Sequence, residues 1–332
     1  MIVKDSKIAV IGAGAWGTAI ANLVAKNSFQ TFLITNNKEN VSEIEKTRLN
    51  EKYLPKVKLS KNLKIEFGIT EKNLKEVDFI FIVTPSQAVE KVFKEISFLK
   101  LKKDVKFVIC SKGLDGNKLK FFSEIFSDIL PKYKFAVLSG PNFAIEVGLE
   151  VPTVTTIASK NKVLAKEVIK ILNNNYFLAE YSKDVITTEI SAVLKNVMAI
   201  GCGIIDGLDL GQNAKAALVK KGIDEILLLC KKLKGKGELT NSAGFGDIFL
   251  TCSTTKSRNN LLGFEIAKGK TYSEVSKNLN KTFEGAVSVK SIVKLAKKKK
   301  IELKLCQAID EILTKNYSTK EIQEKITKAI IS

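Results

Sequence analysis

The chain has 332 residues, of which 45% are hydrophobic and 27% are charged, and it carries a formal net charge of +19 with no histidine. A single hydrophobic core rarely grows beyond about 250 residues, so this length predicts two domains, and the composition excludes an intrinsically disordered chain. The lack of histidine excludes Ser-His-Asp triads, histidine-ligated metals and an imidazole acid, so proton chemistry has to come from lysine or a carboxylate.

The N-terminus and the cysteines predict a cytoplasmic protein. The chain passes from Met1 through Lys4 and Lys7 straight into a strand pattern, without the long apolar segment of a signal peptide. The unbroken apolar runs are far shorter than the ~20 residues of a membrane-spanning helix, so we expect no membrane insertion. The five cysteines are widely spaced and include no Cys-x-x-Cys pair, which predicts buried, reduced thiols and no metal site.

The excess of positive charge is compatible with either nucleic-acid binding or a lysine-rich solvated surface. The lysines are scattered along the whole chain, with one notable run at residues 297–300. A nucleic-acid footprint is usually clustered on one face or helix, so we expect surface lysines and no nucleic-acid partner. A positive field would also attract phosphorylated small molecules.

Up to about residue 180, short apolar runs alternate with helical stretches. This pattern is typical of a mostly parallel sheet with crossover helices, and strands that are apolar throughout are buried on both faces. We therefore predict an α/β domain of the Rossmann type, with a mostly parallel, doubly wound sheet, over residues 1–185. The strands expected in this domain are residues 7–11, 31–35, 78–83, 106–111, 135–139 and 153–158.

The first predicted strand leads into the glycine-rich loop GAGAWG at residues 12–17 and then into a helix. In such a loop Gly12 permits the tight turn, Gly14 lets the backbone approach a pyrophosphate, and Gly17 lets the helix pack on the strand. We therefore predict a dinucleotide site here. The second strand ends in Thr-Asn-Asn-Lys at residues 35–38, with no carboxylate typical of NAD sites and no arginine typical of NADP sites, so the cofactor preference stays open.

After about Asp184 the pattern changes to helical spacing. Apolar side chains from Ile190 to Met198 repeat with the period of a helix, and further helical stretches follow. We therefore predict an all-α second domain over residues 186–332. Its expected later helices are residues 214–233, 261–267, 287–297 and 306–314.

Several side chains of the second domain have types suited to chemistry. Lys195 lies beside the apolar stripe of the first helix, a position that by itself is typical of a solvated lysine. Further on, Asp247 and the segment Ser257-Arg258-Asn259 supply a carboxylate, a hydroxyl, a guanidinium and an amide. The planar fork of Arg258 suits bidentate binding of phosphate, whereas a surface helix cap is the alternative interpretation of this segment.

Many short motifs occur in a fixed order from Ile8 to about Val289. In the first domain they are GAGAWGTA (12–19), YLP (53–55), VTPS (83–86), SKG (111–113) and LSGPNFA (138–144). In the second they are LKNV (194–197), DGL (206–208), NAKAAL (213–218), GD (246–247), LTC (250–252), SRN (257–259) and EG (284–285). With these motifs the chain resembles the bacterial-type NAD(P)-dependent glycerol-3-phosphate dehydrogenases over nearly its whole length.

This resemblance implies reversible reduction of dihydroxyacetone phosphate to sn-glycerol 3-phosphate by NADH or NADPH, without a metal. It implies that Lys195 is the catalytic acid and base and contacts the substrate. The other implied substrate contacts are Lys112, Gly140, Asp247, Ser257, Arg258 and Asn259. Besides the loop glycines, the implied cofactor contacts are Ala15, Trp16, Lys112, Ala144, Arg258, Thr282 and Glu284.

The resemblance has further implications. It suggests a homodimer through the helical domain and a role in supplying glycerol phosphate for phospholipid synthesis. Asn142 stands where the family usually has serine or threonine, so we leave it out of the predicted site. Asn36 stands where the family often has a basic residue, which leaves both NAD and NADP admissible.

Two other functions fit parts of the sequence. A related two-domain dehydrogenase for a hydroxy acid or a ketopantoate-like substrate would use an arginine for a carboxylate, and residues 257–259 alone do not separate carboxylate from phosphate. A nucleotide-sensing nucleic-acid binder would use the Rossmann domain as a switch, and it would need neither Lys195 nor Asp247. The resemblance favours the phosphate-binding dehydrogenase.

Overall fold

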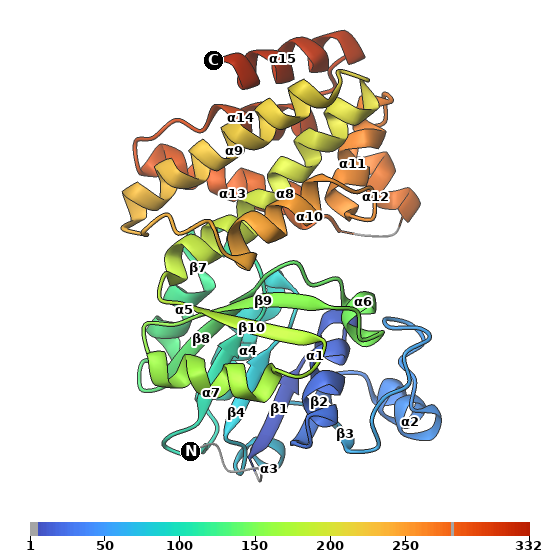
Figure 1. The fold of residues 1–332 in the computed structure, drawn as a ribbon, viewed down its shortest axis with the longest axis vertical. Coiled ribbons are helices and arrows are strands. Elements are labelled where there is room, and N and C mark those ends of the chain that lie inside the picture. The colour runs from blue at the N-terminus through green and yellow to red at the C-terminus, as the bar shows by residue number, and fades with distance from the viewer. Residues whose placement is uncertain (1–5, 280–281) are drawn as a thin grey trace. The chain divides into compact units, whose positions relative to one another are not determined.

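The computed structural model describes residues 6–279 and 282–332, and its internal contacts divide the chain into two compact units (Figure 1). The first unit holds residues 6–112 and Phe121–Val185, and the second holds Gly113–Lys120 and Ile186–Ser332. The sequence predicted a single division of the chain, between residues 185 and 186. The contacts in addition group the segment Gly113–Lys120 with the second unit.

The first unit is built on an eight-stranded sheet. Its strands are β1 (Lys7–Ile11), β2 (Gln30–Thr35), β3 (Leu63–Phe67), β4 (Phe79–Ile82), β5 (Lys106–Ile109), β8 (Lys134–Ser139), β9 (Thr153–Ala158) and β10 (Phe177–Ser182). Their spatial order is β10-β9-β8-β5-β4-β1-β2-β3, and every neighbouring pair is parallel except β8 with β9. The run β3-β2-β1-β4-β5-β8 has the doubly wound order, which confirms the predicted fold class.

Two strands, β3 and β10, are absent from the strands expected from the sequence. Both lie at the edges of the sheet, and their sequences LKIEF and FLAEYS mix polar with apolar residues. The strands were predicted from runs of residues that are apolar throughout, and such runs are typical of strands covered on both faces. Edge strands keep polar side chains toward solvent, so this criterion missed them.

Helices cover both faces of this sheet because its strands are apolar on both sides. The helices of the first unit are α1 (Ala15–Lys26), α2 (Lys38–Thr47), α3 (Glu71–Leu74), α4 (Val89–Ser97), α5 (Phe122–Ile129), α6 (Ala144–Gly148) and α7 (Lys162–Leu172), with a short 3-10 turn at Ser86–Ala88. Ile8 and Val10 of β1 join one core with α1 and α7, and Ala9 and Ile11 join another with α4 and α5 (Figure 1). The loops after the strands can therefore present side chains from a rigid base.

The second unit is helical from residue 186 onward within the described residues, as predicted. Its helices are α8 (Val185–Gly207), α9 (Gln212–Leu233), α10 (Asp247–Cys252), α11 (Arg258–Ala267), α12 (Tyr272–Leu279), α13 (Glu284–Lys298), α14 (Lys304–Thr314) and α15 (Thr319–Ile331), with a π-turn at Ser242–Gly246. Helices α10, α12 and α15 were not predicted from the sequence, although Ser318 and Glu321 form a capping box at the start of α15. A short ladder of β6 (Leu114–Asp115) with β7 (Lys120–Phe121) is a further difference from the prediction.

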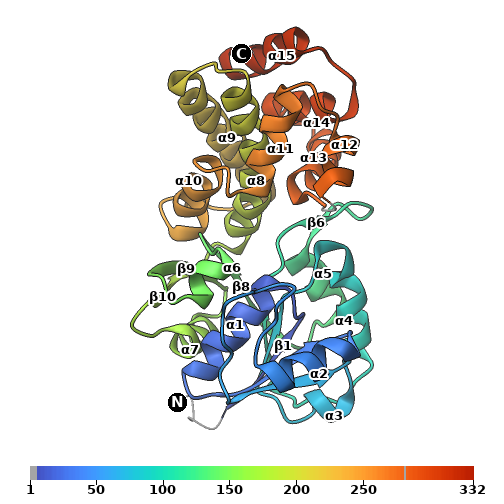
Figure 2. The same cartoon turned by 90° about the vertical axis from the view of Figure 1, so that its right-hand side faces the viewer.

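Helix α8 lies at the centre of the second unit, in contact with α9, α10, α11, α13 and α14 (Figure 2). It is long and apolar enough to cross a membrane by length and composition, but 94% of its most apolar window is buried within the protein. A Cβ on Gly203 would lie 1.9 Å from the carbonyl oxygen of Asn260, and one on Gly263 would lie 1.9 Å from that of Ile200. Only glycine permits this contact of backbones, which sets the start of α11 beside α8.

A buried carboxylate of α9 caps α14. Glu225 is 4% exposed, and its two carboxylate oxygens accept hydrogen bonds from the backbone N–H groups of Leu305, at 2.6 Å, and Cys306, at 3.1 Å. Burial raises the pKa of Glu225, and the hydrogen bonds from these N–H groups oppose that rise. The first turn of α14 thus obtains its acceptors from a different helix rather than from a local cap.

We expect Glu225→Ala to lower the free energy of unfolding by about 3 kcal/mol, because two buried N–H groups lose their acceptor. Chemical denaturation followed by circular dichroism measures this change. The exposed Glu324 of α15 provides the control, and Glu324→Ala should change the free energy by less than about 0.5 kcal/mol. Equal effects of the two substitutions would show that the cap contributes nothing.

Candidate active site

The glycine-rich loop between β1 and α1 can be formed only without side chains at two positions. Gly12 has a φ of +114°, and a Cβ there would lie 2.4 Å from the carbonyl oxygen of Val83. A Cβ on Gly17 would lie 1.8 Å from the carbonyl oxygen of Gly12. The tight turn and the close packing of α1 on β1 that the sequence predicted are therefore both present.

Gly14 differs from its two neighbours in the motif because open space surrounds it. It is the N-cap residue of α1, with a φ of −72°, and no described atom lies within 4 Å of a Cβ built there, apart from its immediate chain neighbours. The first turn of α1 contains no acidic side chain. Its N–H groups and the positive end of the helix dipole therefore face a cradle that suits an anion, and this geometry fits the pyrophosphate of a dinucleotide.

Side chains from outside the motif hold the loop in place. The Asn50 amide donates to the carbonyl oxygen of Ala13 at 3.0 Å and to the Thr18 hydroxyl at 2.8 Å. Sequence reasoning did not identify Asn50, because it lies 32 residues from Thr18 and no local pattern links the two. The loop geometry thus depends on a buried amide contributed by the segment after α2.

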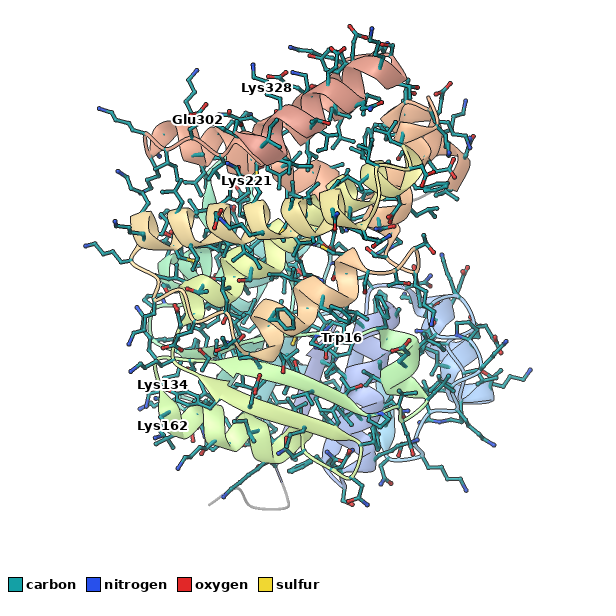
Figure 3. All side chains as sticks on the ribbon, turned by 45° about the horizontal axis from the view of Figure 1, so that its top comes forward. Trp16, Lys134, Lys162, Lys221, Glu302 and Lys328 are labelled. Carbon is teal, nitrogen blue, oxygen red and sulfur yellow. The ribbon has the colours of Figure 1, made fainter. Side chains whose placement is uncertain are left out.

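The other cofactor-contact candidates of the first unit lie close to this loop. Ala15 and Trp16 are in the first turn of α1, and Trp16, labelled in Figure 3, packs with its partly buried ring against the core shared by α1 and α7. Ala144 begins α6 and packs against the same core. All three are only partly buried, so part of each remains accessible to a ligand.

The end of β2 carries no carboxylate, as the sequence indicated. Asn37 caps α2 by accepting hydrogen bonds from the backbone N–H groups of Glu39, at 2.8 Å, and Asn40, at 3.3 Å. Lys38 places its ammonium 5.1 Å from the centre of the Phe67 ring. With Asn36 exposed beside them, these side chains neither repel a 2′-phosphate nor provide the carboxylate that favours NAD.

Lys112 and Gly140 come together at the ends of two neighbouring parallel strands. Lys112 follows β5, Gly140 follows β8, and the Lys112 ammonium donates to the Gly140 carbonyl oxygen at 3.2 Å. A Cβ on Gly140 would lie 2.9 Å from the Cα of Thr155, so this position also requires glycine. Ligands of open α/β sheets bind beyond the carboxyl ends of the strands, and both residues lie at that edge.

Asn142 is next to this pair and has an unused acceptor. The Thr155 hydroxyl donates its single proton to the Ser139 carbonyl oxygen at 3.0 Å, so it accepts the hydrogen bond from the Asn142 amide nitrogen at 2.9 Å. This orientation leaves the Asn142 amide oxygen buried without a hydrogen-bond partner among the described residues. Such an atom needs a donor, and a bound ligand can supply one.

In the second unit, Lys195 forms a buried ion pair with Asp247. The Lys195 ammonium lies 2.8 Å from the Asp247 carboxylate and 2.9 Å from the Thr251 hydroxyl, and the two ionic residues are 7% and 1% exposed. Thr251 donates its own proton to the Asp247 carbonyl oxygen at 2.6 Å, so it presents a lone pair to the ammonium. The interpretation of Lys195 as a solvated surface lysine is wrong, because its side chain is buried and its ammonium is paired.

Asn259 connects three helices beside this ion pair. Its amide nitrogen donates to the Asn196 side-chain oxygen at 3.0 Å, and its own oxygen accepts the backbone N–H of Gly285 at 3.0 Å. Asn196 is the residue after Lys195 on α8, and Gly285 is in the first turn of α13. The link fixes the starts of α11 and α13 relative to the catalytic candidate on α8.

The remaining candidates lie at these helix starts. The Ser257 hydroxyl accepts the backbone N–H of Asn260 at 3.4 Å and so caps α11, while Arg258 is the first residue of that helix and is exposed. Ser257 is thus a helix cap, as the alternative interpretation held, but it is 4% exposed rather than superficial. Glu284 begins α13 and is partly buried, and Thr282, two residues before it, is exposed.

The predicted residues therefore gather in two sets, one in each unit. The first set surrounds the α1 loop and the ends of β5 and β8, and the second surrounds Lys195. From the sequence, Asn50 was not identified, Thr251 and Asn196 were quoted in motifs without a role, and Asn142 was set aside. Within residues 6–279 and 282–332, no group of three or more His, Cys, Asp or Glu side chains is arranged to hold a metal ion.

Comparison with protein families gives two matches that together cover most of the chain. Residues 7–165 match the family model described as the N-terminus of NAD-dependent glycerol-3-phosphate dehydrogenase, and residues 184–324 match the model for its C-terminus. A relative from Leptospira biflexa, named glycerol-3-phosphate dehydrogenase [NAD(P)+], is 35% identical over 321 residues, which are 95% of this chain and 96% of the relative.

Solved structures show the same similarity. The crystal structure of glycerol-3-phosphate dehydrogenase from Coxiella burnetii superposes with a TM-score of 0.92 at 31% identity, covering 99% of this chain and 100% of that one. A ketopantoate reductase from Ralstonia eutropha covers 97% of this chain and 99% of its own, with a TM-score of 0.59 at 14% identity. At that identity the likeness shows a shared fold alone.

Proposed function

Because the chain belongs to the NAD-dependent glycerol-3-phosphate dehydrogenase family, we propose that Lys195 is the general acid and base of its reaction. The protein is an oxidoreductase that uses NAD or NADP and interconverts dihydroxyacetone phosphate and sn-glycerol 3-phosphate. The observation that carries the assignment of Lys195 is its buried pairing with Asp247 and Thr251. A buried ion pair is costly unless its geometry is satisfied, so its presence in this unit favours a catalytic use.

Lys195 meets the chemical demand of carbonyl reduction. When bound, the nicotinamide supplies the hydride that reaches the carbonyl carbon, and negative charge develops on the carbonyl oxygen. Lys195 holds a proton at its Nζ and delivers it to that oxygen, and in the reverse direction it takes the proton from the alcohol. Asp247 and Thr251 hold the Nζ in place, so the proton donor needs no reorientation during the reaction.

We propose that the dinucleotide pyrophosphate binds at the first turn of α1. Gly12, Gly14 and Gly17 shape this site, and Gly14 leaves the space that a phosphate needs against the backbone. Further cofactor contacts are proposed at Ala15, Trp16, Lys112, Ala144, Arg258, Thr282 and Glu284. The lack of a carboxylate after β2 supports the use of either NADH or NADPH.

The phosphorylated substrate is proposed to contact residues of both sets. Arg258 supplies a planar, permanently charged fork at the N-terminus of α11, where the helix dipole also favours an anion. Ser257 and Asn259 flank it, and Asp247 lies beside Lys195. From the first unit we propose contacts by Lys112 and Gly140, and we add Asn142, because its buried amide oxygen requires a donor such as a substrate hydroxyl.

Arg258→Ala should raise the KM for dihydroxyacetone phosphate about 100-fold with a smaller fall in kcat, because about 3 kcal/mol of charged hydrogen bonding to the phosphate is lost. Steady-state kinetics measures both constants. Arg258→Lys should recover part of the affinity, since it restores charge without the bidentate fork. Lys268, exposed at the other end of α11, is the matched control, and an equal effect of Lys268→Ala would refute a specific phosphate contact.

The proposed reaction is tested by the oxidation of NADH or NADPH in the presence of dihydroxyacetone phosphate. Ketopantoate and a 2-keto acid serve as competing substrates, since the hydroxy-acid and ketopantoate alternative predicts turnover of a carboxylate. Turnover with dihydroxyacetone phosphate alone supports the proposal and shows which cofactor is preferred. Turnover with a carboxylate substrate alone would overturn it.

The location, the oligomeric state and the metabolic role of the protein are proposed from its family membership. We propose that the protein works in the cytoplasm without membrane insertion, forms a homodimer through the second unit, and supplies glycerol phosphate for phospholipid synthesis. The nucleic-acid-binding alternative gives no role to the buried Lys195–Asp247 pair, which favours the enzyme. Light scattering tests the dimer, and titration with duplex DNA at increasing salt concentration tests the other alternative.

A further inference from the structure

The first unit has an open groove between α2 and the end of β3, to which the proposed function gives no role. Its volume is about 590 Å³, which is within the range of small-molecule sites. The residues that line it are Lys38, Val41, Ser42, Glu45 and Lys46 of α2 and Phe67 of β3. All of them except Val41 are exposed, so a dissolved small molecule can reach the groove.

The ends of three neighbouring strands connect this groove to the glycine-rich loop. The Gly12 N–H donates to the Ile34 carbonyl oxygen of β2 at 2.9 Å, and the Gly68 N–H, just after β3, donates to the Thr35 carbonyl oxygen at 2.9 Å. Neighbouring strands are about 4.8 Å apart, so the end of β3 lies about 10 Å from the end of β1. When the pyrophosphate lies at the first turn of α1, the adenosine ribose lies at the end of β2, between the loop and the groove.

An accessible aromatic ring in this groove holds the side chain of Lys38. Phe67 continues the face of β3 formed by Leu63 and Ile65, which are buried in one core with Ile44 of α2. This core ends before Phe67, which is 43% exposed. The Lys38 ammonium lies 5.1 Å from the centre of the Phe67 ring, which attracts it by a cation–π interaction. Since Lys38 begins α2 three positions after the end of β2, the ring keeps this charge close to the expected ribose position.

The charges of the groove favour a phosphate group at its Lys38 end. Lys38 and Lys46 outnumber the single carboxylate among the lining residues, which is that of Glu45. Glu45 is seven residues from Lys38, which is about 10 Å along a helix, and salt screens exposed charges over that distance. Glu39 is also in the first turn of α2, but it is not among the residues that line the groove.

We propose that Lys38, held by the ring of Phe67, binds the 2′-phosphate of NADPH and thereby makes NADPH the preferred cofactor over NADH. This inference rests on the proposed dinucleotide site at the first turn of α1. It selects one of the two cofactors that the absence of a carboxylate after β2 admits. Lys38 contacts the cofactor, whereas Phe67 is a positioning residue that acts through Lys38.

Titration with the reduced cofactors, followed by their fluorescence, tests this preference without turnover. NADPH should bind the parent protein at least about tenfold more tightly than NADH, because the 2′-phosphate gains a charged hydrogen bond. Calorimetry with adenosine 2′,5′-bisphosphate and adenosine 5′-monophosphate, which differ only in the 2′-phosphate, should show the same order of affinity. NADH binding as tightly as NADPH would overturn the inference.

Variants of Lys38 separate a specific contact from the positive field of the whole protein. Lys38→Ala should weaken NADPH binding at least about tenfold and change NADH binding by less than about twofold. Lys38→Glu should bind NADH more tightly than NADPH, because a carboxylate accepts a ribose hydroxyl and repels a phosphate. Lys72, exposed on α3, is the matched control. An equal loss of NADPH affinity in Lys72→Ala would overturn the contact.

Variants of Phe67 test its positioning role by the difference between the two cofactors. Phe67→Leu should weaken NADPH binding about threefold and leave NADH binding unchanged, whereas Phe67→Tyr keeps the ring and should keep the parent's NADPH affinity. Equal weakening of both cofactors by Phe67→Leu would refute this role.

The failure of this inference is distinguishable from the failure of the proposed dinucleotide site. If the parent bound NADH and NADPH equally, the role of Lys38 would be refuted and the site at α1 would stand. If the parent bound neither dinucleotide, the site at α1 would be refuted together with the inference that rests on it.

Discussion

Replacing Lys195 by methionine should lower kcat by about 1,000-fold, because the carbonyl oxygen loses its proton donor while the length of the side chain is kept. The KM should change much less, since the phosphate contacts remain. The same substitution leaves Asp247 buried without its partner, which should destabilise the fold by about 3 kcal/mol or more. Activity and the free energy of unfolding therefore have to be measured on the same samples.

The double variant Lys195→Met with Asp247→Asn separates chemistry from stability. It removes both buried charges, so the unfolding free energy should recover toward that of the parent while kcat stays low. Lys215→Met is the matched control, because Lys215 pairs with Asp206 at 2.7 Å in the same unit, and its kcat should stay within about threefold. Recovery of kcat in the double variant would show that Lys195 serves the fold alone.

The substitutions Gly14→Ala and Gly17→Ala should affect different properties, namely dinucleotide binding and stability. The Cβ of Gly14→Ala meets no described atom within 4 Å beyond its chain neighbours, so stability should be unchanged, but dinucleotide binding should weaken by at least about tenfold because the methyl group occupies the phosphate cradle. The Cβ of Gly17→Ala would lie 1.8 Å from the Gly12 carbonyl oxygen, so α1 has to move away from β1. We expect that variant to lose several kcal/mol of stability, about 3 or more.

Thermal unfolding and titration with NADH or NADPH measure these effects. Fluorescence of the reduced cofactor gives its Kd in both alanine variants without requiring turnover. If Gly14→Ala bound both dinucleotides as tightly as the parent, the pyrophosphate could not lie against this turn. If Gly17→Ala were as stable as the parent, the close contact between α1 and the loop would not be required.

The sequence predicted those parts of the site that depend on neighbouring residues. The loop of Gly12, Gly14 and Gly17 is recognisable because a tight turn between a strand and a helix requires small residues at fixed spacing. The central strands were found because burial on both faces leaves a continuous apolar run. The edge strands β3 and β10 were missed for the converse reason, since they retain polar side chains.

The surroundings of Lys195 could not be predicted from local pattern. Helical periodicity placed Lys195 beside the apolar stripe of α8, but whether that side meets water depends on which helices pack there. Asp247 is 52 residues away along the chain, and only the packing of α10 on α8 brings its carboxylate to the ammonium. Thr251 and Asn196 stand in the motifs LTC and LKNV but were assigned no role for the same reason, because a hydroxyl or amide gains its role from its neighbours in space.

By itself, the sequence determined the fold class, the dinucleotide loop and the family. Periodic burial and glycine spacing are properties of neighbouring residues, and the family motifs can be read in a fixed order along the chain. The tertiary structure alone decided that Lys195 is buried and paired, that the Asn142 amide oxygen lacks a partner among the described residues, and that Glu225 caps α14. Each of these depends on contacts between segments remote in the chain, which are set by how closely the helices and strands pack.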